Sequence, residues 1–216
     1  MAAKERHAAA FITLLLMVLH SSAEEDSAPA GKKVYVDIFK FLNTDDPILS
    51  FTISRSSGNP CKVDFYRNTT ASGTLFERFY WAPNRRTNLE QMFHDSLKGV
   101  FQNSGTAAPE VLNTMYVSKG DGYGRDCWQG TEIMDWQSSD NVCAKFSVKR
   151  PKSCNPGRRS DNQRYSAVTH EIRMRVSESE ESQMRSCLQK LKEPMTSEQV
   201  NAIFACKGKF RNVLDG

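Results

Sequence analysis

One alternating run near the middle of the chain combines a carboxylate with apolar side chains. If the run at residues 127–136 is a strand, Trp128, Glu132, Met134 and Trp136 share one face of it. A buried ammonium needs a carboxylate close by, and aromatic rings attract the cation further. These residues predict an amine pocket with Trp128 and Trp136 as walls and Glu132 as the charge partner. The alternative is an ordinary apolar core, with Glu132 near the edge of a barrel.

A second run, residues 165–176, carries another carboxylate and a guanidinium. Glu171 is the other candidate charge partner for an amine, whereas Arg173 suits a ligand that carries a carboxylate. Alternation groups the apolar residues of this run together, namely Val168, Ile172, Met174 and Val176. Two orientations therefore stay open: Glu171 points outward, or the apolar face lies under a helix and Glu171 points inward.

Sequence motifs of common enzyme classes are absent. The chain has no H-E-x-x-H, no G-x-S-x-G and no phosphate-cradling glycine motif. It also has no C-x-x-C pair that would indicate a structural zinc site. We expect a protein that is not an enzyme, with no catalytic residue, no metal and no cofactor.

The elements that position these residues are short runs rich in β-branched and aromatic residues, each bounded by turn-forming residues. They lie at residues 48–54, 61–67, 74–81, 114–118, 127–136, 143–149 and 165–176. Residues 88–102 fit a helix or an eighth strand, and we favour the strand.

Helical spacing marks both ends of the strand region. Apolar residues between 34 and 42 predict a short helix, and Met184, Cys187, Leu188 and Leu191 give residues 177–192 one apolar face. Thr196 and Gln199 then form a capping signature before another helical stretch. Strands followed by an amphipathic helix predict a mainly β fold, a closed antiparallel barrel of about eight strands with a C-terminal helix on its wall. A two-sheet sandwich is the rival fold.

The N-terminus has the features of a secretory signal peptide. Lys4 and Arg6 precede an apolar run at residues 8–19, and Ala23 is the expected cleavage site. Twelve apolar residues are too few for a bilayer, which requires about twenty. We expect a signal peptide at 1–23, a flexible leader at 24–33 and a single domain at 34–216.

The expected compartment and charge narrow the partners. The formal net charge is only +4, so we expect no nucleic-acid partner, and we expect no membrane association and a secreted monomer. Asn68 begins an N-x-T sequon at an expected hairpin tip, which predicts a glycan. The basic residues at 150–164 form either a solvated loop or a contact for an acidic partner.

All six cysteines lie beyond the signal peptide, and an even number in a secreted chain predicts disulfides. A hairpin formed by residues 127–136 and 143–150 brings Cys127 near Cys154, so we expect these two to pair. Cys143 lies on the face opposite Phe146 and Val148, so its sulfur points outward if those residues face a core. We therefore expect Cys143 to pair with Cys187 on the helix, and Cys61 to pair with Cys206.

The chain resembles the tick salivary lipocalins of the histamine-binding-protein type. The resemblance spans nearly the whole chain after the signal peptide and rests on "VYVDIFKFLNTDDPI", "CKVDFY", "SSDNVC", "HEIRMRV" and "NAIFAC". It implies a lipocalin barrel with the pairs Cys61–Cys206 and Cys143–Cys187. Cys127 and Cys154 are additional to the family's four-cysteine pattern, and the general lipocalin G-x-W signature is absent.

The resemblance also implies a function. Such proteins sequester a small host mediator, so we expect a secreted binder of histamine or serotonin that suppresses host inflammatory and haemostatic defence. In the family's amine-binding signature, Cys143, Glu171 and Cys187 match, whereas Ala144 replaces an Asp and Arg173 replaces an aromatic residue. The alternatives are a binder of a lipid mediator (eicosanoid, fatty acid or sterol) and a protein-binding immunomodulator that uses the barrel as a scaffold.

Overall fold

The computed structural model describes residues 36–53, 61–84, 86–105, 111–119, 130–150, 168–176, 181–191 and 195–215. Its strands are β1 (Ile48–Thr52), β2 (Cys61–Thr70), β3 (Gly73–Pro83), β4 (Glu90–Gln102), β5 (Thr114–Lys119), β6 (Gly130–Gln137), β7 (Cys143–Lys149) and β8 (Thr169–Arg175). Its helices are α2 (Ile38–Leu42), α3 (Glu181–Lys190), α4 (Ser197–Lys209) and α5 (Arg211–Leu214).

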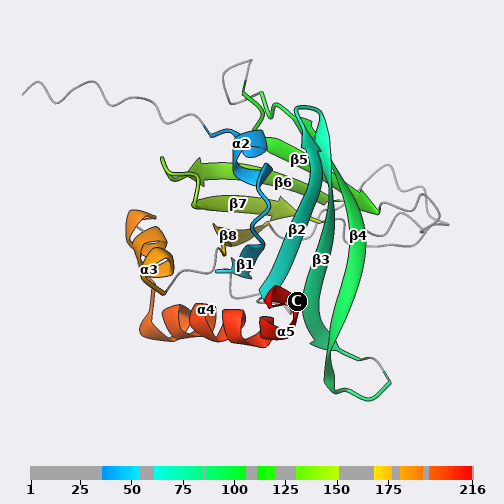
Figure 1. Ribbon diagram of the computed structural model, residues 1–216, viewed down its shortest axis with the longest axis vertical. Helices are drawn as coiled ribbons and strands as arrows, with labels where there is room; N and C mark the ends of the chain where they lie inside the picture. The colour runs from blue at the N-terminus through cyan, green and yellow to red at the C-terminus, as the bar shows by residue number, and fades with distance from the viewer. Residues whose placement is uncertain are drawn as a thin grey trace, which may run out of the picture. The chain divides into compact units, whose positions relative to one another are not determined.

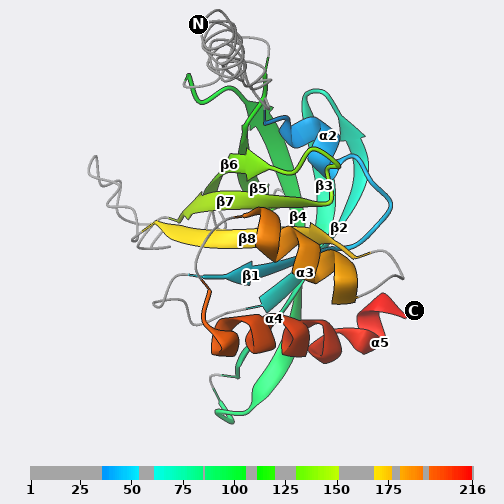
Figure 2. The same ribbon diagram turned by 90° about the vertical axis from the view of Figure 1, so that its left-hand side faces the viewer.

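The strands follow one another in chain order and close into an antiparallel barrel, since β8 pairs back onto β1 (Figures 1 and 2). This closure confirms the expected mainly β barrel and excludes the two-sheet sandwich. Residues 90–102 form a strand, as expected. The predicted capping signature is confirmed at α4, where Thr196 and Gln199 form a reciprocal capping box.

The short helix α2 closes one end of the barrel, and the β3–β4 hairpin extends from the other end (Figures 1 and 2). The Asp37 side chain caps α2 by accepting from the backbone N–H of Lys40. Arg175, at the end of β8, donates to the carbonyl oxygen of Phe41. Beneath α2, the inner faces of the strands form an apolar cluster that includes Phe76, Leu97, Met115, Met134 and Phe146.

The C-terminal helices cover the outer face of β1 and β8 (Figure 2). The apolar residues of these strands point outward beneath the helices, in a second cluster with Leu49, Phe51, Ile172, Met174, Met184 and Ile203. Since side chains alternate along a strand, this arrangement turns the intervening polar residues of β8 into the barrel. The apolar residues Ile172, Met174 and Val176 therefore lie under the helices, which decides between the two orientations of Glu171.

Two disulfides attach the helices to the barrel wall. Cys61 on β2 pairs with Cys206 on α4, and Cys143 on β7 pairs with Cys187 on α3, each with a Cα–Cα distance of 5.8 Å. Both expected pairs are confirmed. Cys127 and Cys154 lie outside the described residues, as do the expected signal peptide, the leader and the basic loop beyond Arg150.

No helix within the described residues is long and apolar enough to cross a membrane.

Candidate functional site

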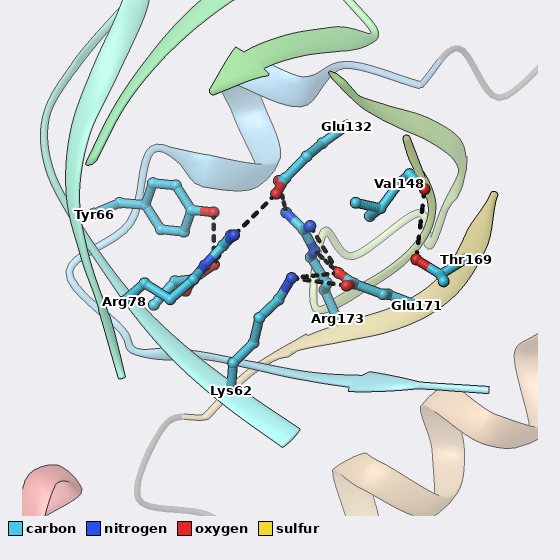
Figure 3. Close-up of polar contacts among 9 residues, drawn as sticks. Lys62, Tyr66, Arg78, Glu132, Val148, Thr169, Glu171 and Arg173 are labelled. Carbon is cyan, nitrogen blue, oxygen red and sulfur yellow. Dashed lines mark hydrogen bonds and ion pairs between the residues drawn. The ribbon is translucent and has the colours of Figure 1, made fainter. Parts of the chain in front are cut away.

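Six charged side chains from four strands meet inside the barrel (Figure 3). All occupy inward positions of the alternation and are at most 6% exposed: Lys62 and Asp64 on β2, Arg78 on β3, Glu132 on β6, and Glu171 and Arg173 on β8. We call these six residues the lumen network. Buried charges are tolerated only when they are paired and hydrogen-bonded, so their contacts decide what else the lumen can bind.

Arg78 joins two of the carboxylates. Its Nε and Nη2 donate to the two carboxylate oxygens of Asp64, each at 2.7 Å, in a bidentate arrangement. Its Nη1 donates to Glu132 Oε1 at 3.1 Å. The Tyr66 hydroxyl also donates to Asp64, at 3.2 Å. Asp64 therefore has a partner for each oxygen.

Arg173 lies between the other two carboxylates. Its Nε and Nη2 donate to Glu171 Oε2, at 3.3 and 2.9 Å. Its Nη1 lies 2.7 Å from Glu132 Oε2, an ion pair that lacks the alignment of a hydrogen bond. The guanidinium carbon is 4.0 Å from the centroid of the Phe146 ring, which is cation–π distance.

Lys62 completes the lumen network. Its Nζ lies 2.8 Å from Oε1 and 2.7 Å from Oε2 of Glu171, and its side chain is 8% exposed. Together the ion pairs join three cations to three carboxylates, so the network carries no net formal charge. A charged ligand of either sign would have to displace an existing partner.

The pKa values of the carboxyl groups follow from these contacts. Burial raises the pKa of Glu132, but Arg173, Arg78 and Lys62 outweigh it and hold that pKa well below its ordinary value. Burial likewise opposes ionisation of Glu171, yet the charges of Lys62 and Arg173 lower its pKa to about 2. Both groups are carboxylates at neutral pH.

The basic partners respond differently. Burial and the nearby charge of Arg78 lower the pKa of Lys62 to about 8, although Glu171 favours the charged amine. The pKa of Arg173 is raised because Glu132 and Glu171 outweigh its own burial. Of the three cations of the lumen network, Lys62 is thus the one whose pKa is lowered.

Ser50 provides a buried hydroxyl beside this network. It lies on β1 directly opposite Lys62 on one side and Arg173 on the other, and it is fully buried. Its Oγ has no hydrogen-bond partner among the described residues. Because an unsatisfied buried hydroxyl is costly, Ser50 is a candidate to bond a polar ligand atom.

A hollow of about 530 Å³ opens at the β3–β4 end of the barrel, and Tyr80, Ala82, Asn84, Arg86 and Phe93 are among its lining residues. Tyr80 and Ala82 follow Arg78 on the inner face of β3, and Tyr80 lies directly opposite Lys62. The Tyr80 and Phe93 rings stack with their centroids 5.7 Å apart. The hollow and the lumen network are therefore related through the β2–β3 pair, in which Tyr80 is the strand partner of Lys62.

The structure brings together three of the residues that the sequence singles out, Glu132, Glu171 and Arg173. Trp136 does not join them, so its predicted place on the same face as Glu132 is wrong. The β6–β7 register shifts between Met134 and Trp136, so the Trp136 side chain points to the outer face of the barrel. There it packs in the second cluster, which also contains Cys143. Trp128 lies outside the described residues.

Sequence reasoning missed the other half of the lumen network, Lys62, Asp64 and Arg78. A usable signal was present on β2. Cys61 bonds to a helix outside the barrel, so alternation places Lys62 and Asp64 inside. On β7 the expectation that Phe146 and Val148 face the core and that Cys143 faces outward is confirmed.

Among the residues that the structure describes, no cluster of His, Cys, Asp and Glu is arranged to hold a metal ion. Comparison with known proteins finds no family model that matches this chain and no curated protein that matches it.

Proposed function

We propose that this protein is a secreted, lipocalin-type barrel that binds a small host mediator and removes it from solution. The hollow carries this proposal, because its volume of about 530 Å³ falls within the range of small-molecule sites, roughly 300–1,000 Å³. Two stacked rings line it, and one of them, Tyr80, is the strand partner of Lys62 in the lumen network. Apolar walls with a few fixed polar groups are typical of ligand sites.

Of the two ligand classes that the family resemblance implies, the site favours a lipid mediator over a biogenic amine. An ammonium needs a free carboxylate, but Asp64, Glu132 and Glu171 are each bound by internal cations. A lipid would place its apolar part against the aromatic wall. Arg86 lines the hollow and suits an acidic headgroup there.

Native mass spectrometry of protein secreted by a eukaryotic host tests this proposal. We expect a retained small molecule that organic solvent extracts, and we expect arachidonic acid or cholesterol to replace it. Calorimetry with the delipidated protein should give binding to at least one of these lipids and none to histamine or serotonin.

A variant pair locates the binding site. Ala82→Trp places an indole in the hollow and should reduce lipid affinity at least tenfold. Leu75→Trp is the control, since Leu75 lies on the outer face of the same strand and is 46% exposed. No retained molecule and no binding of any of these compounds at micromolar protein would contradict the proposed function.

A further inference from the structure

The guanidinium of Arg173 occupies an environment that suits an organic cation. Carboxylate oxygens of Glu132 and Glu171 lie 2.7 and 2.9 Å from its terminal nitrogens. The face of the Phe146 ring lies 4.0 Å from its central carbon. Two carboxylates and an aromatic face are the groups that bind a ligand ammonium or guanidinium.

These three partners come from three different strands, and each has a further contact that does not involve Arg173. Glu132 is on β6 and is also held by Arg78, whereas Glu171 is on β8 and is also held by Lys62. Phe146 is directly opposite Glu171 across the β7–β8 pair and packs against Phe41. Each of the three groups around the guanidinium is therefore also held by another residue of the barrel or of α2.

We propose that Glu132, Glu171 and Phe146 form a cation subsite in the lumen, and that Arg173 fills this subsite from within and makes the barrel refuse cationic ligands there. Arg173 is thus the residue that sets the charge class of the ligand. The effect of Arg173 on the natural ligand rests on the proposed function. The subsite itself can be tested with a small cation, whatever the natural ligand is.

Arg173 excludes free cations from the subsite because its guanidinium is covalently linked to β8. A free cation pays translational entropy to bind, whereas Arg173 competes with the advantage of an intramolecular group. The Arg173 guanidinium is fully buried in the structure. A cation that displaced it from Glu132 and Glu171 would leave a buried charge without partners. An external ammonium consequently has two costs that the resident side chain does not have.

Removing the side chain should open the subsite. In Arg173→Ala we expect methylguanidinium chloride to raise Tm by roughly 3–6 °C at about ten times its Kd. N-methylurea has the same shape without the charge and should have no such effect, and potassium chloride corrects for ionic strength. Wild-type Tm should not rise with methylguanidinium. Absence of the rise in Arg173→Ala, or an equal rise with N-methylurea or in the wild type, would overturn the proposal.

Arg175→Ala is the matched control on the same strand. Arg175 also lies over an aromatic ring, Phe41 at 5.7 Å, but it donates to the carbonyl oxygens of Lys40 and Phe41. Among the described residues no ion pair joins Arg175 to a carboxylate, so methylguanidinium should stabilise this variant much less than Arg173→Ala. Equal stabilisation of both variants would show a nonspecific effect and would count against the subsite.

A second measurement decides the question if Arg173→Ala does not fold. Histamine is titrated against the wild type, Glu132→Gln and Glu171→Gln by calorimetry. The proposal expects no binding, or binding elsewhere that neither substitution changes. Histamine binding to the wild type that weakens tenfold or more in either variant would overturn it, because the cation would then use these carboxylates with Arg173 in place. Failure of lipid binding would contradict the proposed function and leave these results unaffected.

Discussion

Ala144 and Arg173 are direct partners across β7 and β8, and both are fully buried on the inner face of the barrel. They are also the two positions at which the sequence departs from the amine-binding signature of the lipocalins that it resembles, which has an Asp and an aromatic residue there. The departures therefore remove a negative charge and add a positive one at a single point of the lumen. This change of charge supports the proposed preference for a lipid over an amine.

The lumen network should contribute strongly to stability through Glu132. Glu132→Gln is expected to lower the free energy of unfolding by about 3–5 kcal/mol, because Arg78 and Arg173 lose the carboxylate between them. Urea denaturation measures the loss. Glu90→Gln is the control, since Glu90 and Lys209 form an ion pair with side chains 62% and 45% exposed. We expect a loss below about 1 kcal/mol there, and equal losses would contradict the role of the network.

Acid should weaken the fold through Glu171. The pKa of this carboxyl is about 2 in the folded protein against an ordinary 4.5. A pKa that is lower in the folded state gives stability above the unfolded-state value, and that stability is lost as pH falls from about 4.5 to about 2. Over this pH range the free energy of unfolding should fall by about 3 kcal/mol more in the wild type than in Glu171→Gln. Urea midpoints measured at several pH values test this, and parallel curves would refute it.

The two disulfides should differ in their contributions because they close loops of different length. Cys61–Cys206 spans 145 residues and Cys143–Cys187 spans 44. Loop-closure entropy predicts about 5 and about 4 kcal/mol, so replacing both cysteines of the first pair by Ala should destabilise more. Denaturation of the two double variants measures the order. The opposite order would show that packing of α3 and α4, and not loop length, dominates.

Asn68 should carry a glycan in protein from a eukaryotic secretory host. Its side chain is exposed on β2, three residues before the turn into β3. We expect an intact mass that corresponds to a chain beginning near Glu24 with an attached glycan. Peptide N-glycosidase should lower this mass, and Asn68→Gln should remove the glycan. Asn88→Gln, outside any sequon, is the control. An unmodified Asn68 in the secreted protein would show that the sequon is not used.

The strands could be predicted from the sequence because they depend on local alternation, and on β7 the alternation also indicated the inward face. Phe146 and Val148 lie inside and Cys143 lies outside, as their spacing indicates. Local spacing failed at Trp136, since an irregularity in the β6–β7 register reverses the alternation after Met134. Such a shift depends on the partner strand and leaves no mark in the pattern of one strand.

The sequence by itself predicted a closed barrel of alternating strands, the pairs Cys61–Cys206 and Cys143–Cys187, and Glu132 and Glu171 as the candidate carboxylates on their strands. Only the tertiary structure decided what those carboxylates bind. Arg78 meets Glu132 across 54 residues of chain and Lys62 meets Glu171 across 109. Barrel closure brings these strands together, and burial then requires every charge to find a partner among residues that no local pattern connects.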